Sequence, residues 1–172
     1  MQEPLSTMTG SETLDALSAI QPMHNKPLQH LGMAKKAGLL AIGSDAVKSA
    51  AMSGKARLIV VTTDISGGSA RQAKYYAEDS GALFVETPYS KFEFGRVAGR
   101  GSPGVLAILD TGLAEGFIKK LVDIDGNRYK ELAEKIQEKA AQEKVKQAKK
   151  EAQTVKAKTA KKLSSKKRRT DK

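Results

Sequence analysis

The residues of this sequence that could do chemistry are cations and glycines, not acid–base pairs or nucleophiles. The 172 residues include 30 Lys and Arg, no Cys and two His, His24 and His30. The lack of cysteine excludes disulfides, thiolate-bound zinc, iron–sulfur clusters and thiol nucleophiles. Asp64 follows an apolar run, but no base, metal partner or nucleophile accompanies it, so a structural role is favoured. We therefore expect no catalytic residue, no metal and no cofactor.

One glycine-rich run, Gly99-Arg100-Gly101-Ser102-Pro103-Gly104, matches the pattern G-x-G-x-x-G. A dinucleotide site needs a strand before these glycines and a helix that opens on them. Here the apolar run follows the glycines and Pro103 lies among them, so that interpretation is rejected. Two alternatives remain evenly balanced on local evidence. The run is either a flexible loop that approaches a phosphate chain, with Arg100 at its tip, or an ordinary connection between a helix and a strand.

Positive charge is concentrated in the last third of the chain. Residues 119–172 hold nineteen basic and eight acidic residues, a net charge of +11, whereas residues 28–118 carry a net +2. Basic segments of this density typically bind polyanions, because each neutralised phosphate releases condensed counterions. For residues 156–169 this interpretation is favoured over a merely solubilising tail. No apolar stretch approaches the ~20 residues of a membrane span, and no secretory signal is evident, so we expect a cytoplasmic protein with no membrane partner.

The elements that must position these residues alternate between strands and helices. Apolar runs predict strands at residues 39–42, 58–62, 83–85 and 105–109. Amphipathic spacing predicts helices at residues 28–36, 44–54, 70–81, 92–97 and 113–122, with Ser44 as the N-cap of the second. Continuously apolar strands indicate a sheet that is buried on both faces. The predicted class is therefore α/β, a three-layer α/β/α sandwich with a central, mostly four-stranded sheet.

Composition divides the chain into four parts. We expect a disordered leader at residues 1–27 and the folded domain at residues 28–122. Residues 123–155 read as a charged helical extension, and residues 156–172 as a disordered basic tail. The extension has a thin apolar stripe, which either docks a partner helix or, as we favour, belongs to a solvated helix.

Several segments of residues 28–122 resemble, in the same order, those of the L-seven-Ae ribosomal protein family. Leu31–Gly38 is similar to the opening "LGLAxRAGK" helix of the family. Lys55–Val61, followed by Asp64, is similar to its "GKAKLVxxAxD" strand, and Ser90–Gly95 to its "SKxELG" segment. The glycine-rich run and the apolar run after it are similar to the variable loop and last strand. The resemblance covers a little over half the chain and is strongest to the bacterial YlxQ-like branch.

This resemblance implies a non-enzymatic RNA-binding protein with the L-thirty-e fold, associated with the ribosome or another RNA–protein particle. In the family, the start of the second helix reads bases at a kink-turn and the loop before the last strand covers the bulge. The implied contacts are Gly43, Ser44, Asp45, Lys48, Ser49, Arg100, Gly101, Ser102 and Pro103. We add Lys35, Lys36 and Lys55 as phosphate contacts. RNA is the expected partner, the ribosome a further one, and a monomer is favoured.

The sequence departs from the kink-turn readers at the reading helix. Where they carry Gly-x-Asn-Glu, it has Gly43-Ser44-Asp45-Ala46. Asparagine donates and accepts hydrogen bonds, whereas an ionised aspartate only accepts. We therefore expect binding mainly through phosphates, with a weak preference for kinked RNA. The alternative is a protein-interaction scaffold whose tail alone binds nucleic acid. An RNA-modifying enzyme is disfavoured, because the chain is too short for a separate methyltransferase domain.

Overall fold

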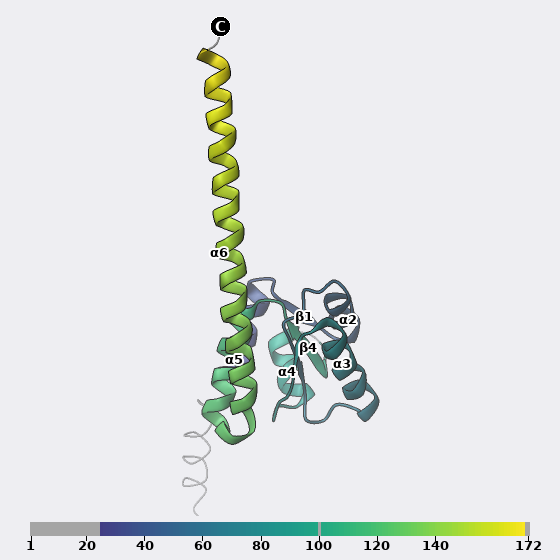
Figure 1. The fold of residues 1–172 in the computed structure, drawn as a ribbon. Helices are drawn as coiled ribbons and strands as arrows, with labels where there is room; N and C mark the ends of the chain where they lie inside the picture. The colour runs from purple at the N-terminus through teal and green to yellow at the C-terminus, as the bar shows by residue number, and fades with distance from the viewer. Residues whose placement is uncertain (1–24, 100, 171–172) are drawn as a thin grey trace, which may run out of the picture. The chain divides into compact units, whose positions relative to one another are not determined.

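The computed structural model describes residues 25–99 and 101–170, without the side chains of residues 167–170 (Figure 1). The predicted leader, apart from residues 25–27, lies outside the described residues. The chain divides into a first compact unit that ends at Ile136 and a second unit that begins at Gln137. The first unit contains a four-stranded sheet between helices, so the predicted α/β class is confirmed.

The sheet has the strand order β1-β4-β2-β3. Strand β4 (Val105–Ile108) is antiparallel to both β1 (Leu40–Ile42) and β2 (Leu58–Val61). Strand β3 (Leu83–Glu86) is parallel to β2. Strands β1, β2 and β3 therefore run in one direction, and the connections that leave them emerge at the same end of the sheet. The sequence predicted the four strands but neither their order nor their directions.

Helices cover both faces of the sheet (Figure 1). Helices α2 (Ser44–Met52) and α3 (Gly67–Ser80) pack on one face. The other face is covered by a helix over residues 25–36, by α4 (Lys91–Ala98), by α5 (Thr111–Ile124) and by the first residues of α6 (Gly126–Thr170). Alternate residues of one strand serve the two cores, which explains why the strands are apolar throughout. The predicted three-layer sandwich is confirmed.

The helix starts follow from local capping. The Ser66 hydroxyl accepts a hydrogen bond from the Ser69 amide at the start of α3, and Asp110 caps α5 in the same way through Leu113. Helix α4 opens with a full capping box. The predicted N-cap at Ser44 is wrong, because Gly43 occupies that position. The φ of Gly43 is 89°, a conformation that glycine adopts without the steric cost a serine would meet there.

The first residues of α6 belong to the compact unit. Tyr129 and Ile136 are buried in the core that α4 and α5 form, and Leu132 packs against it. The Tyr129 hydroxyl donates a hydrogen bond to the carbonyl oxygen of Glu86, on β3, at 3.1 Å. The compact unit thus extends past residue 122, where composition placed the end of the folded domain. Apolar residues spaced by three and four place one face of α6 toward the core.

The second unit is the remainder of α6. The helix continues to Thr170, and the side chains of residues 144–166 are exposed. Residues 156–170 are therefore helical here, whereas their low complexity predicted disorder. Residues 127–170 contain neither glycine nor proline and are rich in Ala, Lys, Glu and Gln, all strong helix formers. Over the described residues, no helix is long and apolar enough to cross a membrane.

Candidate nucleic-acid interface

Three helices begin at one end of the sheet. Helices α2, α3 and α4 follow β1, β2 and β3, which run in the same direction, and β4 starts at this end after the glycine-rich loop. The first N–H groups of a helix have no partner within it, and the helix dipole adds partial positive charge. We call this region the helix-start surface and define it by Gly43–Asp45, Ser66–Ser69, Lys91 and Gly101–Gly104.

The start of α2 lies directly beside the end of the glycine-rich loop. The Gly43 amide donates a hydrogen bond to the carbonyl oxygen of Val105 at 3.1 Å, which extends the antiparallel pairing of β1 and β4. The carbonyl oxygen of Gly104 accepts hydrogen bonds from the Thr62 amide at 3.0 Å and the Thr62 hydroxyl at 3.4 Å. The end of β2 thus holds the loop from the other side.

Most of the residues that the resemblance implied lie together at or next to this surface. Ser44, Asp45, Lys48 and Ser49 are exposed on α2. Because residues three and four apart share a helix face, these side chains form one polar strip. Gly101 and Ser102 are exposed and Pro103 is half-buried in the neighbouring loop. Arg100 lies outside the described residues. That these residues bind RNA stays a prediction.

The three added lysines lie elsewhere. Lys55 follows the far end of α2, and Lys36 is the last residue of the helix before β1, at the end of the sheet where β1 and β2 begin. Lys35 donates a hydrogen bond to the carbonyl oxygen of Ala98, the last residue of α4, at 2.6 Å. The sequence predicted these lysines as phosphate contacts, but spacing along the chain carries no information on which end of the sheet they reach.

Lys91 belongs to the helix-start surface and was missed. Its amide donates a hydrogen bond to a carboxylate oxygen of Asp64 at 2.9 Å. A Cβ placed on Gly104 would lie 3.2 Å from Lys91 Cε, so the lysine side chain runs beside the loop. Partial desolvation would raise the pKa of Asp64, but hydrogen bonds from Lys91 and Thr62 outweigh it and hold that pKa below its usual value. The available signal was the position of Lys91 directly after the cap at Ser90.

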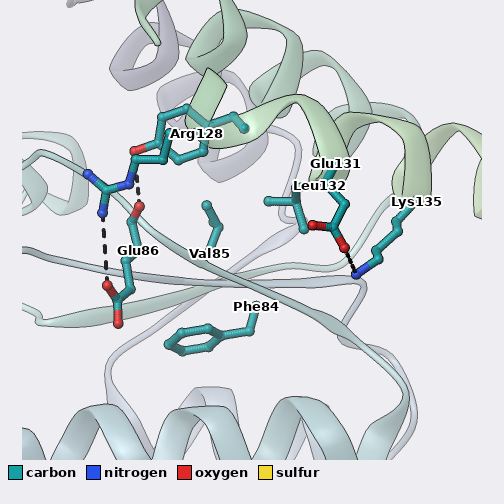
Figure 2. A pocket seen from close by; sticks show the side chains of 8 residues that line it. Phe84, Val85, Glu86, Arg128, Glu131, Leu132 and Lys135 are labelled. Carbon is teal, nitrogen blue, oxygen red and sulfur yellow. Dashed lines mark hydrogen bonds and ion pairs between the residues drawn. The ribbon is translucent and has the colours of Figure 1, made fainter. Parts of the chain in front are cut away.

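A separate pocket lies between β3 and the first residues of α6 (Figure 2). Its charged side chains pair with one another: Arg128 lies 3.9 Å from Glu86, and Lys135 lies 2.7 Å from Glu131. Phe84, Val85 and Leu132 supply the apolar part of its lining. The first ion pair joins α6 to the edge strand β3, and the second lies within α6. The pocket therefore supports the packing of α6 on the sheet, and none of these four charged residues is unpaired.

His30 is a partly buried titratable group within the fold. Its Nε2 atom is buried and has no hydrogen-bond partner among the described residues. A Cβ on Gly116 would lie 2.6 Å from this nitrogen, so the histidine packs closely against α5. Burial lowers the pKa of His30, the Lys120 charge lowers it further, and a hydrogen bond with the Leu113 backbone opposes both. Over the described residues, no group of three or more potential metal ligands is found.

Comparison with known proteins shows the fold alone. No protein-family model matches the chain, and no curated protein matches it significantly. A protein of unknown function from Bacillus halodurans is similar in structure, with a TM-score of 0.51 and 20% sequence identity over 55% of this chain and 95% of that one. A Giardia lamblia 15.5kD RNA binding protein matches with a TM-score of 0.49 and 18% identity over 61% of this chain and 89% of that one. The second similarity is too distant to carry an argument.

Proposed function

We propose that this protein binds structured RNA and catalyses no reaction. The observation that carries the proposal is the hydrogen bond between Gly43 and Val105, which joins the start of α2 to the loop before β4. These are the two segments that the resemblance to the L-seven-Ae family implies as RNA contacts. Their sequence separation is large, so their adjacency comes from the sheet and not from a local motif.

The helix-start surface suits phosphates better than base edges. Backbone N–H groups at helix starts donate to phosphate oxygens and position nucleic acid without reading its sequence. Lys48 and Lys91 add cations on α2 and beside the loop. Asp45 offers only acceptors, and Ala46 offers neither a donor nor an acceptor. The domain on this proposal recognises the shape of a folded RNA and prefers a standard kink-turn only weakly.

The basic part of α6 supplies a second contact. Residues 144–172 hold thirteen basic residues against Glu151 and Asp171. The side chains of residues 144–166 are exposed along a continuous helix. A helical arrangement distributes cations around the axis, so phosphates of a duplex or of a bent strand can be neutralised along its length. This contact adds affinity for any RNA, whereas the domain supplies the selectivity for folded RNA.

Finer features of the proposal come from the resemblance and the composition. We propose membership of the YlxQ-like branch, association with the ribosome or another RNA–protein particle, a cytoplasmic location and a monomeric state. We propose no cofactor for this function. The rival function is a protein-interaction scaffold whose tail alone binds nucleic acid. It is favoured by one observation, the small net charge of +2 over residues 28–118.

Crosslinking with peptide mapping separates the two functions. The full chain is bound to a bulged RNA hairpin, irradiated, digested, and the crosslinked peptides are identified. Crosslinks in α2 and the loop peptide as well as in residues 144–172 are expected if the domain binds RNA. Crosslinks confined to residues 144–172 would establish the scaffold instead. A matched unbulged duplex serves as the control for shape recognition, because the tail binds both RNAs equally.

A further inference from the structure

The glycine-rich loop runs back along α4 after that helix ends. Helix α4 closes with Gly99 in the left-handed conformation, at a φ of 76°. A Cβ on Gly95 would collide with the carbonyl oxygen of Gly101, so the loop backbone lies directly on α4 at this point. One helical turn earlier, Lys91 lies against Gly104. The described part of the loop, residues 101–104, therefore contacts α4 at Gly95 and at Lys91.

Lys35 holds the beginning of this return path. Its Nζ atom donates a hydrogen bond of 2.6 Å to the carbonyl oxygen of Ala98. A Cβ on Gly99 would come within 2.9 Å of the same nitrogen, so the ammonium group lies over the turn where the chain reverses. The last carbonyls of a helix lack partners within it, and the dipole places partial negative charge there, so a lysine is well matched to this end.

The neighbouring lysine differs in its surroundings. Lys35 and Lys36 are consecutive and both exposed in part, but no hydrogen bond or ion pair is found for Lys36 within the described parts of the chain. The two therefore make a matched pair, one engaged by α4 and one extending into solvent. Both were predicted as phosphate contacts, but Lys35 is bonded to the carbonyl oxygen of Ala98.

We propose that Lys35 is a positioning residue for RNA binding, which acts by holding the glycine-rich loop against α4 and not by contacting phosphate. This inference rests on the proposed function. The loop is held by a contact at each of its ends. Thr62 bonds Gly104 beside the start of α2. Lys35 bonds Ala98 at the turn where the loop begins. Between them Gly95 leaves the room that the Gly101 carbonyl occupies. Release of the turn would move Gly101 and Ser102 relative to Ser44 and Asp45.

The first test needs no RNA. Amide hydrogen exchange at the ends of the loop is compared among the full-length protein, K35M, K36M and K35R. Loss of one charge-assisted hydrogen bond predicts about tenfold faster exchange in K35M of two amides: that of Gly99, which donates to Gly95, and that of Thr62, which donates to Gly104 of the loop. We expect no change in K36M and a return toward the original rate in K35R, whose guanidinium can donate to the same carbonyl. Unchanged exchange of these amides in K35M would overturn the proposal.

The second test measures RNA affinity in a double-mutant cycle with a bulged RNA hairpin as the probe. K35M and G95A each displace the loop, so each is expected to weaken binding and their combination to weaken it little further. If Lys35 contacted phosphate directly, the two effects would multiply, and that result would contradict a positioning role. Failure of the unaltered protein to bind the probe would contradict the proposed function, while the exchange experiment would still decide whether Lys35 holds the loop.

Discussion

The amide of Gly43 donates a hydrogen bond to the carbonyl oxygen of Val105 at 3.1 Å, and through it the first turn of α2 meets the end of the glycine-rich loop. The bond continues the pairing of β1 with β4 by one residue beyond Ile42 and Leu106. Gly43 makes it at a φ of 89°, where other residues are strained. The candidate interface is therefore built on the sheet beneath it, and we expect that its exposed side chains can be changed without loss of the fold.

Selectivity for kinked RNA can be increased at α2. Asp45, Ala46 and Ser49 are exposed, so the triple change D45N, A46E and S49K alters the contacts without altering the core. Each good base-edge pair contributes about 1–3 kcal/mol of discrimination. We expect the triple change to raise the preference for a kink-turn RNA over the same RNA without its sheared pairs, measured by gel shift. A preference of a hundredfold or more in the unaltered protein, about 2.7 kcal/mol, would show that α2 already reads the kink.

Removal of residues 144–172 is expected to weaken binding to any RNA and to flatten its salt dependence. The segment carries thirteen basic residues, and on single strands each neutralised phosphate contributes ~0.7 to the slope of log affinity against log salt. The melting temperature should hold, because the side chains of residues 144–166 are exposed. The measurement is a salt titration of affinity on a bulged hairpin and on a plain duplex. An unchanged slope would show that this part of α6 makes no RNA contact.

The compact unit should depend on the first residues of α6. Ile136 is 1% exposed and Val145, on the same helix, is 54% exposed. Truncation of a buried isoleucine to alanine costs about 2–5 kcal/mol, whereas exposed substitutions stay within about 0.5 kcal/mol. Denaturant unfolding should show a large loss of stability for I136A and almost none for V145A. Equal effects would mean that the folded domain ends before α6.

Two helical glycines should respond to alanine in opposite ways. A Cβ on Gly116 would lie 2.6 Å from two atoms of the His30 ring, whereas a Cβ on Gly32 meets nothing within 4 Å. We expect G116A to destabilise by about 1–3 kcal/mol through overpacking. We expect G32A to stabilise by about 0.4–1 kcal/mol through the unfolded state. Chemical unfolding of both variants measures the difference, and a stabilising G116A would contradict the close packing of His30 on α5.

Stability should fall as the pH is lowered through the range where the unfolded histidine titrates. Burial holds the pKa of folded His30 below the ordinary 6.5. Below about pH 6.5 the unfolded chain therefore binds a proton that the folded protein does not, and the free energy of unfolding decreases by at most about 1.4 kcal/mol per pH unit. Above that pH the effect vanishes. Unfolding between pH 7.5 and 5 should show a shallower loss in H30Q than in the unaltered protein, with H24Q as the control. If the unfolding free energies of H30Q and the unaltered protein decrease equally with pH, His30 is not the cause of the loss.

Local signals in the sequence were sufficient for the elements of the fold. The apolar run at residues 58–62 and its three counterparts become the four strands, because a strand buried on both faces is apolar throughout. Gly38, Gly54 and Gly81 follow helices in the conformation that ends them, with positive φ. The low sequence complexity of residues 156–170 predicted disorder, but these residues are helical, as their Ala and Lys content favours.

Only the tertiary structure decided which of these elements are neighbours. Strand β4 inserts between β1 and β2, and this order brings the glycine-rich loop to the start of α2. Lys35 and Lys36 are chemically identical and adjacent in the sequence, yet only Lys35 is found bonded to the end of α4. That contact spans 63 positions of the chain, so no local pattern encodes it. It arises because Leu31 and Phe94 are buried in one core, which packs the helix over residues 25–36 against α4. The end of α4 thereby comes within reach of Lys35.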